Sequence, residues 1–557
     1  MFCYQCQETL NNKGCDKIGV CGKNSEVSDL QDLLIYLLKG ISYWAVKARE
    51  IGIRDEEVDI FVAKGLFSTI TNVNFDPERF VAWIEEAFEK RDRIRKEFFD
   101  AYKKKYSKEF SEKIPDCAQW KCDREKGEML AKAKTVGILS DATLNEDLRS
   151  LREFETISLK GMAAYIDHAY ILGFEDEELF AFLHEALYAT IDEKNGTDEM
   201  FDYVMRTGKM GLKAMELLDK ANTSAYGNPE PTMVNIGVEE GPSILMSGHD
   251  LKDFEELLDQ AKAAGVNVYT HGEMLPAHAY PFFKKYPNLI GNYGNAWWKQ
   301  NEEFEKFNGP VILNTNCLIP PRDSYIDRLF TTGLVGWPGV KHIADRPKGG
   351  KKDFSEVIKK ALEIGKGPEK LESGKIPVGF AHKTVESVLD KLEKLVRSGK
   401  IKRFFLMSGC DGRMKSRQYH TDLALKIPKD AVILTSGCAK YRYNKLDLGE
   451  IDGIPRVLDA GQCNDSYSWI VIASKLVELF GVESVNDLPL SFDIAWYEQK
   501  AVIILNTLLS LGIKKIRLGP TLPAFVSPNI LKVLVEKFEL KPITTVEEDL
   551  QAMLRGE

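Results

Sequence analysis

The sequence has no long hydrophobic run and no leader-like N-terminus. No uninterrupted apolar stretch approaches the roughly 18 residues that a membrane-spanning helix needs. The first residues, Met1 to Gln7, contain no basic segment followed by an apolar one, so we expect no secretory signal. These absences predict a cytoplasmic protein without a membrane partner, in which thiols stay reduced and disulfides are rare.

A positive charge excess and a nucleotide-binding loop are also missing. The chain has 84 acidic and 75 basic residues, which give a net charge of -9. Phosphate backbones are bound by clustered Lys and Arg, so no nucleic-acid partner is expected. No G-x-G-x-x-G loop with a following acidic partner occurs, so we predict no nicotinamide cofactor.

The most unusual feature is a group of four cysteines at the N-terminus. Four of the ten cysteines lie within the first 21 residues, at Cys3, Cys6, Cys15 and Cys21. Zinc ribbons usually pair two C-x2-C knuckles, and only one such pair is present here. The uneven spacing favours an iron–sulfur cluster wrapped by a loop, with zinc as the alternative. Cys117 and Cys122 have no metal-like neighbours in the sequence, and we predict that they are free thiols.

A chain of 557 residues predicts several domains, of which the first, residues 1–222, is helical. After the cysteine motif (1–23), apolar residues recur at helical spacing. A capping box is predicted at Ser28 to Gln31, and Gly52 is predicted to end the first helix. The pattern returns 121 residues later. The matching segments are Leu38-Lys39-Gly40 with Leu159-Lys160-Gly161, Gly52 with Gly173, and Asp55-Glu56-Glu57 with Asp176-Glu177-Glu178. We therefore predict two duplicated helical bundles, at about 24–120 and 121–222.

The composition changes after a predicted linker at residues 222–231, which is rich in small and polar residues. Short apolar runs then alternate with helical segments, which is typical of doubly wound, parallel α/β structure. We predict two Rossmann-like α/β domains, at residues 223–370 and 371–557. The predicted fold class is therefore multidomain, α and α/β.

Potential metal ligands follow seven of the predicted strands. In open parallel sheets, ligands bind beyond the carboxyl ends of the strands. Glycine or asparagine precedes most of these positions, and glycine lets the backbone approach a bound group closely. A single cysteine, histidine or glutamate at such a place is usually structural. Seven together predict one site with thiolate, imidazole and carboxylate ligands: His249, Glu273, Cys317, Cys410, Cys438, Cys463 and Glu498.

The remaining histidines and an acidic helix receive structural interpretations. His168 and His184, in the helical part, are predicted to be packed or surface residues. His271 is the histidine most expected to support the site, because it lies two residues before Glu273. Glu302, Glu303 and Glu305 are predicted to form a solvated helix face.

These motifs resemble the hybrid-cluster protein family, also called prismane proteins or hydroxylamine reductases, over essentially the whole chain. The opening Met1 to Thr9, with Cys15 and Cys21, resembles the form whose N-terminal cluster is [4Fe–4S]. The resemblance implies a hybrid [4Fe–2O–2S] cluster held by the seven strand-end residues. It implies a persulfide on Cys410, within Ser408 to Gly412, and adds Lys500 to the site.

The resemblance implies an enzyme that reduces hydroxylamine to ammonia and water. From the residue types we expect catalytic roles for Glu498, Lys500, His249 and Glu273, and we expect the N-terminal cluster to relay electrons to the site. Electrons would come from a ferredoxin or a dedicated reductase. The open alternatives are a nitric oxide reductase or a protein S-nitrosylating factor in nitrosative-stress defence, and a nickel enzyme similar to carbon monoxide dehydrogenase.

Overall fold

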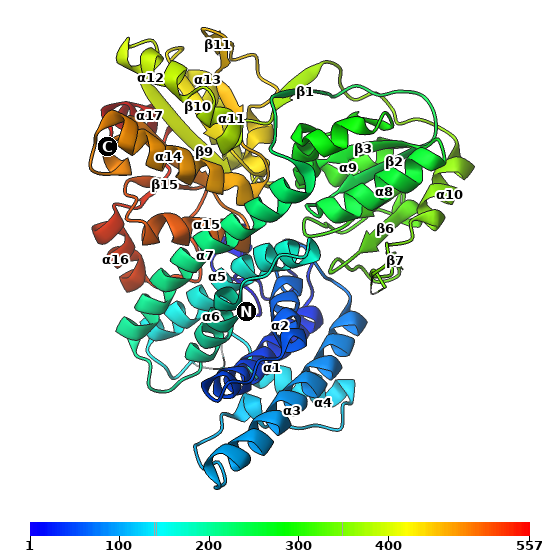
Figure 1. Cartoon of the computed structure of the whole chain (residues 1–557), viewed down its shortest axis with the longest axis vertical. Coiled ribbons are helices and arrows are strands. Elements are labelled where there is room, and N and C mark those ends of the chain that lie inside the picture. Colours follow the sequence, from blue (N-terminus) through cyan, green and yellow to red (C-terminus); the bar gives the residue numbers. More distant parts are fainter. Residues whose placement is uncertain (139, 141, 348) are drawn as a thin grey trace.

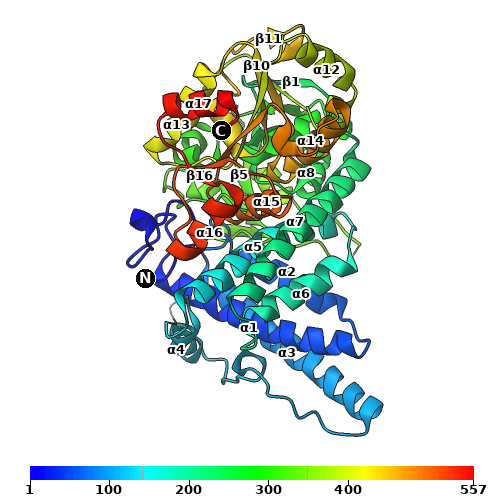
Figure 2. The ribbon, with the colours of Figure 1, turned by 90° about the vertical axis from the view of Figure 1, so that its left-hand side faces the viewer.

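The computed structural model describes residues 1–138, 140, 142–347 and 349–557. A helical part occupies the lower half of Figure 1, and two parallel sheets lie side by side above it. The N-terminus lies where the helical part meets the rest of the molecule, at the left edge of Figure 2. The predicted fold class is confirmed.

The helical part contains two copies of the same three-helix unit, with one additional helix, α4 (Lys126–Val136), between them in the sequence. Its helices are α1 (Ser25–Glu50), α2 (Glu56–Ser68), α3 (Pro77–Tyr106), α4 (Lys126–Val136), α5 (Glu146–Ile171), α6 (Glu177–Ala189) and α7 (Thr197–Tyr226). The helices α1, α2 and α3 have 26, 13 and 30 residues, and α5, α6 and α7 have the same three lengths. Asp55 caps α2 and Asp176 caps α6 with their side chains. The predicted duplication is therefore confirmed.

The repeated Leu-Lys-Gly motif allows two close helix contacts. A Cβ atom on Gly40 would lie 2.2 Å from the carbonyl oxygen of Cys117, and one on Gly161 would lie 2.3 Å from that of Gln499. Glycine is needed here because any side chain would collide with the neighbouring backbone. Gly161 thereby lets α5 pack closely on α15 (Gln499–Ser510), a helix of the last part of the chain.

Two local predictions are wrong. The helix α1 begins at Ser25, capped by Asn24, whose side chain accepts from the amide of Val27. Ser28 instead donates to the carbonyl of Phe2 and holds the N-terminal loop. The predicted linker is helical up to Tyr226, because the ring of Tyr226 is buried against Phe283 and other aromatic side chains. This burial outweighs the polar composition of the segment.

The first sheet is parallel, with strand order β4-β3-β2-β5-β6-β7. Its strands are β2 (Ser243–Ser247), β3 (Asn267–His271), β4 (Leu289–Asn292), β5 (Val311–Leu313), β6 (Leu329–Thr332) and β7 (Lys341–Ile343). Its helices are α8 (Leu251–Ala263), α9 (Gln300–Lys306) and α10 (Ser355–Ile364). The strand order reverses between β2 and β5, so the crevice that binds ligands in such sheets lies beyond these two strands.

The second sheet is also parallel, with order β13-β10-β9-β14-β15-β16. Its strands are β9 (Arg403–Gly409), β10 (Ala431–Thr435), β13 (Val457–Asp459), β14 (Leu490–Ala495), β15 (Ile516–Gly519) and β16 (Lys541–Pro542). Its order reverses between β9 and β14. The other helices are α11 (His382–Glu386), α12 (Leu389–Arg397), α13 (Gln418–Lys426), α14 (Ser466–Phe480), α16 (Pro528–Phe538) and α17 (Val546–Arg555).

Two short antiparallel pairs complete the fold. The strand β1 (Thr232–Asn235) pairs with β8 (Lys375–Val378), and β11 (Glu450–Ile451) pairs with β12 (Ile454–Pro455). The first pair joins the segments that precede the two sheets. The predicted domain limits stay a prediction. Within the described residues, no helix combines the length and the apolar character needed to cross a membrane.

Candidate metal centres

The four N-terminal cysteines come together in one loop. Cys3, Cys6, Cys15 and Cys21 line the same small cavity. The amide of Cys15 donates to the carbonyl of Cys3 (2.8 Å), which closes the loop on itself. Cys3 is partly exposed and the other three are buried. Burial raises the pKa of the Cys6 thiol well above its usual value. The neighbouring thiols of Cys21 and Cys3 raise this pKa further by electrostatic repulsion.

The N-terminal loop is fixed to the segment that follows β14. The amide of Gln7 donates to the carbonyl of Tyr497 (2.9 Å). Arg417, which is fully buried, donates to the side chain of Gln7 and to the carbonyl of Trp496, at 2.7 Å each. These bonds place the N-terminal loop beside Glu498. Thr71 and Asn72 line both the cysteine cavity and the cavity described next.

All seven strand-end residues line one cavity between the two sheets. These residues follow β2, β3 and β5 of the first sheet and β9, β10, β13 and β14 of the second: His249, Glu273, Cys317, Cys410, Cys438, Cys463 and Glu498. The cavity lies beyond the carboxyl ends of the strands, on the side where both sheets reverse their strand order. Six of the seven are buried and Cys317 is partly exposed.

Tight backbone turns bring these side chains to the cavity. Gly248, Gly409, Gly437 and Gly461 all have positive φ angles. A Cβ atom on Gly409 would lie 2.0 Å from the carbonyl oxygen of Ala495, so no other residue fits there. Cys317 itself has a φ of 86°, a conformation that costs energy for a residue with a side chain. Such an outlier is commonly maintained at functional sites.

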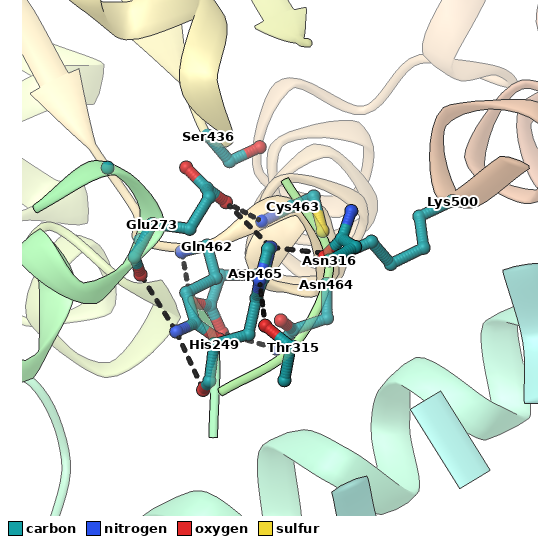
Figure 3. Close-up of polar contacts among 12 residues, drawn as sticks. His249, Glu273, Thr315, Asn316, Ser436, Gln462, Cys463, Asn464, Asp465 and Lys500 are labelled. Carbon is teal, nitrogen blue, oxygen red and sulfur yellow. Dashed lines mark hydrogen bonds and ion pairs between the residues drawn. The ribbon is translucent and has the colours of Figure 1, made fainter. Parts of the chain in front are cut away.

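His249 is held so that its Nε2 atom faces the other ligands. The Nδ1 atom lies 2.9 Å from Thr315 Oγ1, and Nε2 lies 3.7 Å from Glu273 Oε2. His249, Glu273 and Cys463 each place one potential metal-ligand atom within 4.8 Å of the other two. Among the described residues, this is the one set of three or more His, Cys, Asp or Glu side chains that does so. Gln462 supports this group, because its side-chain amide donates to the carbonyls of His249 (3.0 Å) and Glu273 (2.9 Å), as Figure 3 shows.

Lys500 reaches the same group from the start of α15. Its Nζ atom lies 2.9 Å from both His249 Nε2 and Asn316 Oδ1, and 3.7 Å from Glu498 Oε1. Glu498 caps α15 by accepting from the amide of Lys500 (2.8 Å). Burial opposes the charge of Lys500, but Cys463 and Glu498 outweigh it and raise its pKa above the usual value. Lys500 therefore holds its proton more firmly than a free lysine, next to the ligands of the cavity.

Comparisons with known proteins show the family of the chain. A model of the Prismane/CO dehydrogenase family matches residues 1–551. The chain belongs to this family. The predicted relationship to prismane proteins is thus confirmed.

Similar curated proteins match from end to end. A protein of Halothermothrix orenii named hydroxylamine reductase is 61% identical over 557 residues, with all of both chains covered. A protein of Nitratidesulfovibrio vulgaris with the same name is 58% identical over 558 residues, again with full coverage of both. As a member of this family, the chain is an iron–sulfur oxidoreductase.

Solved structures of similar fold are carbon monoxide dehydrogenases. The chain is 17% identical to carbon monoxide dehydrogenase IV from Carboxydothermus hydrogenoformans, with a TM-score of 0.57, and covers 92% of that chain. It is 16% identical to the nickel-free enzyme from Thermococcus sp. AM4, with a TM-score of 0.56 and coverage of 91%. At these identities the likeness is one of fold.

The residues of the cavity between the two sheets suit a metal cluster. Burial raises the pKa of the Cys317 and Cys438 thiols well above the usual value, so they ionise readily only next to a cation. Glu273 Oε1 is buried and has no hydrogen-bond partner among the described residues. A buried carboxylate oxygen without a partner is costly, and a metal ion would supply that partner. The individual ligand assignments stay a prediction.

Several supporting residues gave no clear signal in the sequence. Thr315 and Asn316 touch His249 and Lys500, and only their place before Cys317 pointed to them. His168 stacks on His249 with ring centroids 6.3 Å apart, although nothing in the sequence linked them. Glu303 was predicted to be solvated and is buried instead, because Nε2 of His271 lies 2.9 Å from its carboxylate.

Three residues that were not predicted to be metal ligands, His271, His184 and Cys117, form contacts within the fold. Nδ1 of His271 lies 2.9 Å from the hydroxyl of Ser247 at the end of β2, so this histidine braces the strand ends. His184 is fully buried between Ser42 and Asp59. Cys117 is buried, and its carbonyl accepts from the guanidinium of Arg91 (3.2 Å).

Proposed function

We propose that this protein reduces hydroxylamine to ammonia and water. The reaction breaks the N–O bond and consumes two electrons and two protons. The observation that carries the proposal is the convergence of thiol, imidazole and carboxylate ligands on one cavity, with Lys500 in contact with the ligand His249. The name that the full-length relatives share supports this choice of substrate.

We infer that the cavity holds a hybrid [4Fe–2O–2S] cluster and that Cys3, Cys6, Cys15 and Cys21 hold a [4Fe–4S] cluster. Cys410 would carry a persulfide. Thiolates favour iron and sulfide, whereas imidazole and carboxylate leave positions that exchange more easily. When bound, the hybrid cluster would supply electrons and a Lewis-acidic iron to the nitrogen substrate.

The chain's own residues would manage the protons. Lys500 bears a proton on Nζ within reach of His249 and Glu498, so it can donate to the departing hydroxide. Burial raises the pKa of Glu498 and Glu273, although Lys500 partly opposes this at Glu498. Both carboxyl groups therefore hold a proton more readily than an exposed glutamate does, which suits a role in proton delivery.

An external protein would deliver the electrons, either a ferredoxin or a dedicated reductase in the cytoplasm. Cys3 is the partly exposed member of the N-terminal group, so electrons can arrive there from the surface. Thr71 and Asn72 border both cavities, and the hydroxyl of Tyr497 donates to Asn72 Oδ1 (2.6 Å). The two cavities thus share lining residues, which favours electron transfer between the two sites.

Substitution of Glu498 tests the proposal. Glu498→Gln keeps an acceptor for the α15 cap, and Glu498→Ala removes it. We expect both variants to retain most of their iron and to lose ammonia formation by about 100-fold or more, because a general acid–base group contributes roughly that much. Hydroxylamine consumption and ammonia are measured with a reduced dye as donor. Unchanged activity in Glu498→Gln would remove this carboxylate from the mechanism.

Nitric oxide reduction is the second candidate. A largely apolar cavity of about 310 Å³ is lined by residues of α14, α15 and the second sheet, and it includes Ser408 and Ser466. Ser436 joins these two hydroxyls through contacts of 2.6 and 2.8 Å, and the three serines lie within three residues of Cys410, Cys438 and Cys463. An apolar cavity suits an uncharged gas. The rates of reduction of nitric oxide and of hydroxylamine, measured side by side, decide between the two functions.

A further inference from the structure

A further cavity, which is polar, reaches His168 and Thr315, two residues in contact with His249. Its volume is about 640 Å³, and its walls come from α2, α3, α5 and the segments that follow the strands of the first sheet. Acidic and basic side chains occur in equal numbers among its lining residues. The cavity therefore offers many hydrogen-bonding groups without attracting ions of one sign.

The inner end of this cavity is formed by residues that touch His249. The ring of His168 lies between those of Phe67 (5.4 Å between centroids) and His249 (6.3 Å). Thr315 lines the cavity and contacts Nδ1 of His249. His249 thus connects the lining of the polar cavity with the predicted cluster site.

Two buried polar atoms at this end have no partner. Asp167 is 3% exposed and His168 is 8% exposed. Within the part of the chain that the structure describes, Asp167 Oδ1 and His168 Nε2 have no hydrogen-bond partner. Buried polar groups are nearly always paired, so unpaired ones that line a cavity mark a place for a small bound molecule.

We propose that this polar cavity is the access route and holding site for the small substrate, which Asp167 and His168 bind beside His249. The proposal rests on the proposed function and extends it to substrate binding. Hydroxylamine is uncharged at neutral pH, and it both donates and accepts hydrogen bonds. It therefore matches an acceptor and an imidazole nitrogen in a cavity with balanced charge. Asp167 and His168 act here as positioning residues.

A matched pair of substitutions on α3 tests the route. Glu86 lines the cavity and Glu89 does not; both are exposed, and each is paired with one basic residue, Lys90 or Arg124. Glu86→Trp narrows the cavity, so kcat/KM for hydroxylamine should fall several-fold while kcat at saturation is kept. Glu89→Trp should match the wild-type protein. Equal kcat/KM in the two variants would overturn the proposed route.

Binding without turnover tests the positioning residues. Methoxyamine, a methylated hydroxylamine, is titrated calorimetrically into the iron-loaded protein in the absence of any electron donor. His168→Phe keeps the ring between Phe67 and His249, and Asp167→Asn keeps the side-chain volume. One lost hydrogen bond is worth about 1 kcal/mol, so we expect about fivefold weaker binding in each variant. An unchanged dissociation constant in both would contradict the proposal.

A crystal of the loaded protein soaked with methoxyamine gives an independent readout. Density beside Asp167 and His168 would support the site, and density only at the cluster would oppose it. Failure of the proposed function looks different, because wild-type protein would then form no ammonia from hydroxylamine at all. Normal ammonia formation with equal rates in Glu86→Trp and Glu89→Trp would instead reject only the route.

Discussion

At the scale of single residues, the structure separates metal ligands from the residues that orient them. Lys500, Thr315 and Gln462 contact His249, and Gln462 also contacts Glu273. Residues that hydrogen-bond to a ligand fix its orientation and tautomer, and they affect metal affinity strongly. The central site therefore depends on more residues than its seven predicted ligands.

Thr315 provides a test of this supporting role. Thr315→Val removes the hydroxyl that contacts His249 Nδ1, and we expect iron affinity at the seven-ligand site to fall by about 10-fold or more. Thr331→Val is the matched control, because it removes an equivalent contact of 3.0 Å to His342 on a neighbouring strand. Iron retained during chelator challenge is measured for both. Equal retention would show that Thr315 does not orient the ligand.

The sequence could predict the ligands, but not all of their surroundings. Six of the seven predicted ligands follow an apolar run and a glycine or asparagine, so the pattern is visible along the chain. His168 lies on α5, far from His249 in sequence, and meets it only because the helical part packs against the first sheet. Glu303 appeared solvated because its short helix is acidic, whereas its contact with His271 is a tertiary one.

At the scale of elements, close helix packing sets the position of α15. Gly161 on α5 approaches the carbonyl of Gln499, and α15 begins at the residue after Glu498. Gln499 also donates to the carbonyl of Gln5 (2.7 Å) in the N-terminal loop. The contact between α5 and α15 therefore fixes Glu498, Lys500 and the cysteine loop relative to one another.

Replacement of Gly161 tests this contact. We expect Gly161→Ala to destabilise the protein by about 1–3 kcal/mol, because the added methyl group overlaps the carbonyl of Gln499. Gly127→Ala on α4 is the matched control: it has open space around it and should stabilise by about 0.5–1 kcal/mol. Chemical denaturation and iron content are measured together. Equal stability changes in both variants would exclude the close-packing argument.

A buried carboxyl on α5 predicts a pH dependence of stability. Burial raises the pKa of Glu155 to about 8, although Thr207 donates to it. The folded state then holds a proton that the unfolded state releases from about pH 4.3. Stability is therefore lost as the pH rises through this window to about 8, by at most about 1.4 kcal/mol per pH unit.

Glu155→Gln should remove this loss, since glutamine has no proton to release. Its melting temperature relative to wild type should rise between pH 5 and pH 8. The exposed Glu146→Gln on the same helix should show no such trend. A constant difference between wild type and Glu155→Gln across this range would show that Glu155 is ionised in the folded protein.

At the scale of the whole molecule, the fold brings seven strand ends and a remote N-terminal loop to one region. The fold class and the helical duplication were predictable, because hydrophobic periods of helices and strands are local signals. The start of α1 and the end of α7 were not, because Ser28 bonds to Phe2 and Tyr226 packs on aromatic rings from the first sheet region. Such contacts form only after the parts assemble.

Metal analysis after strictly anaerobic purification tests the central claim most directly. Iron, nickel, zinc and acid-labile sulfide are measured per chain. The account predicts about eight irons and no nickel, as two clusters of about four irons each require. About four irons, zinc in place of iron, or stoichiometric nickel would contradict it, because at least one of the two proposed sites would then be wrong.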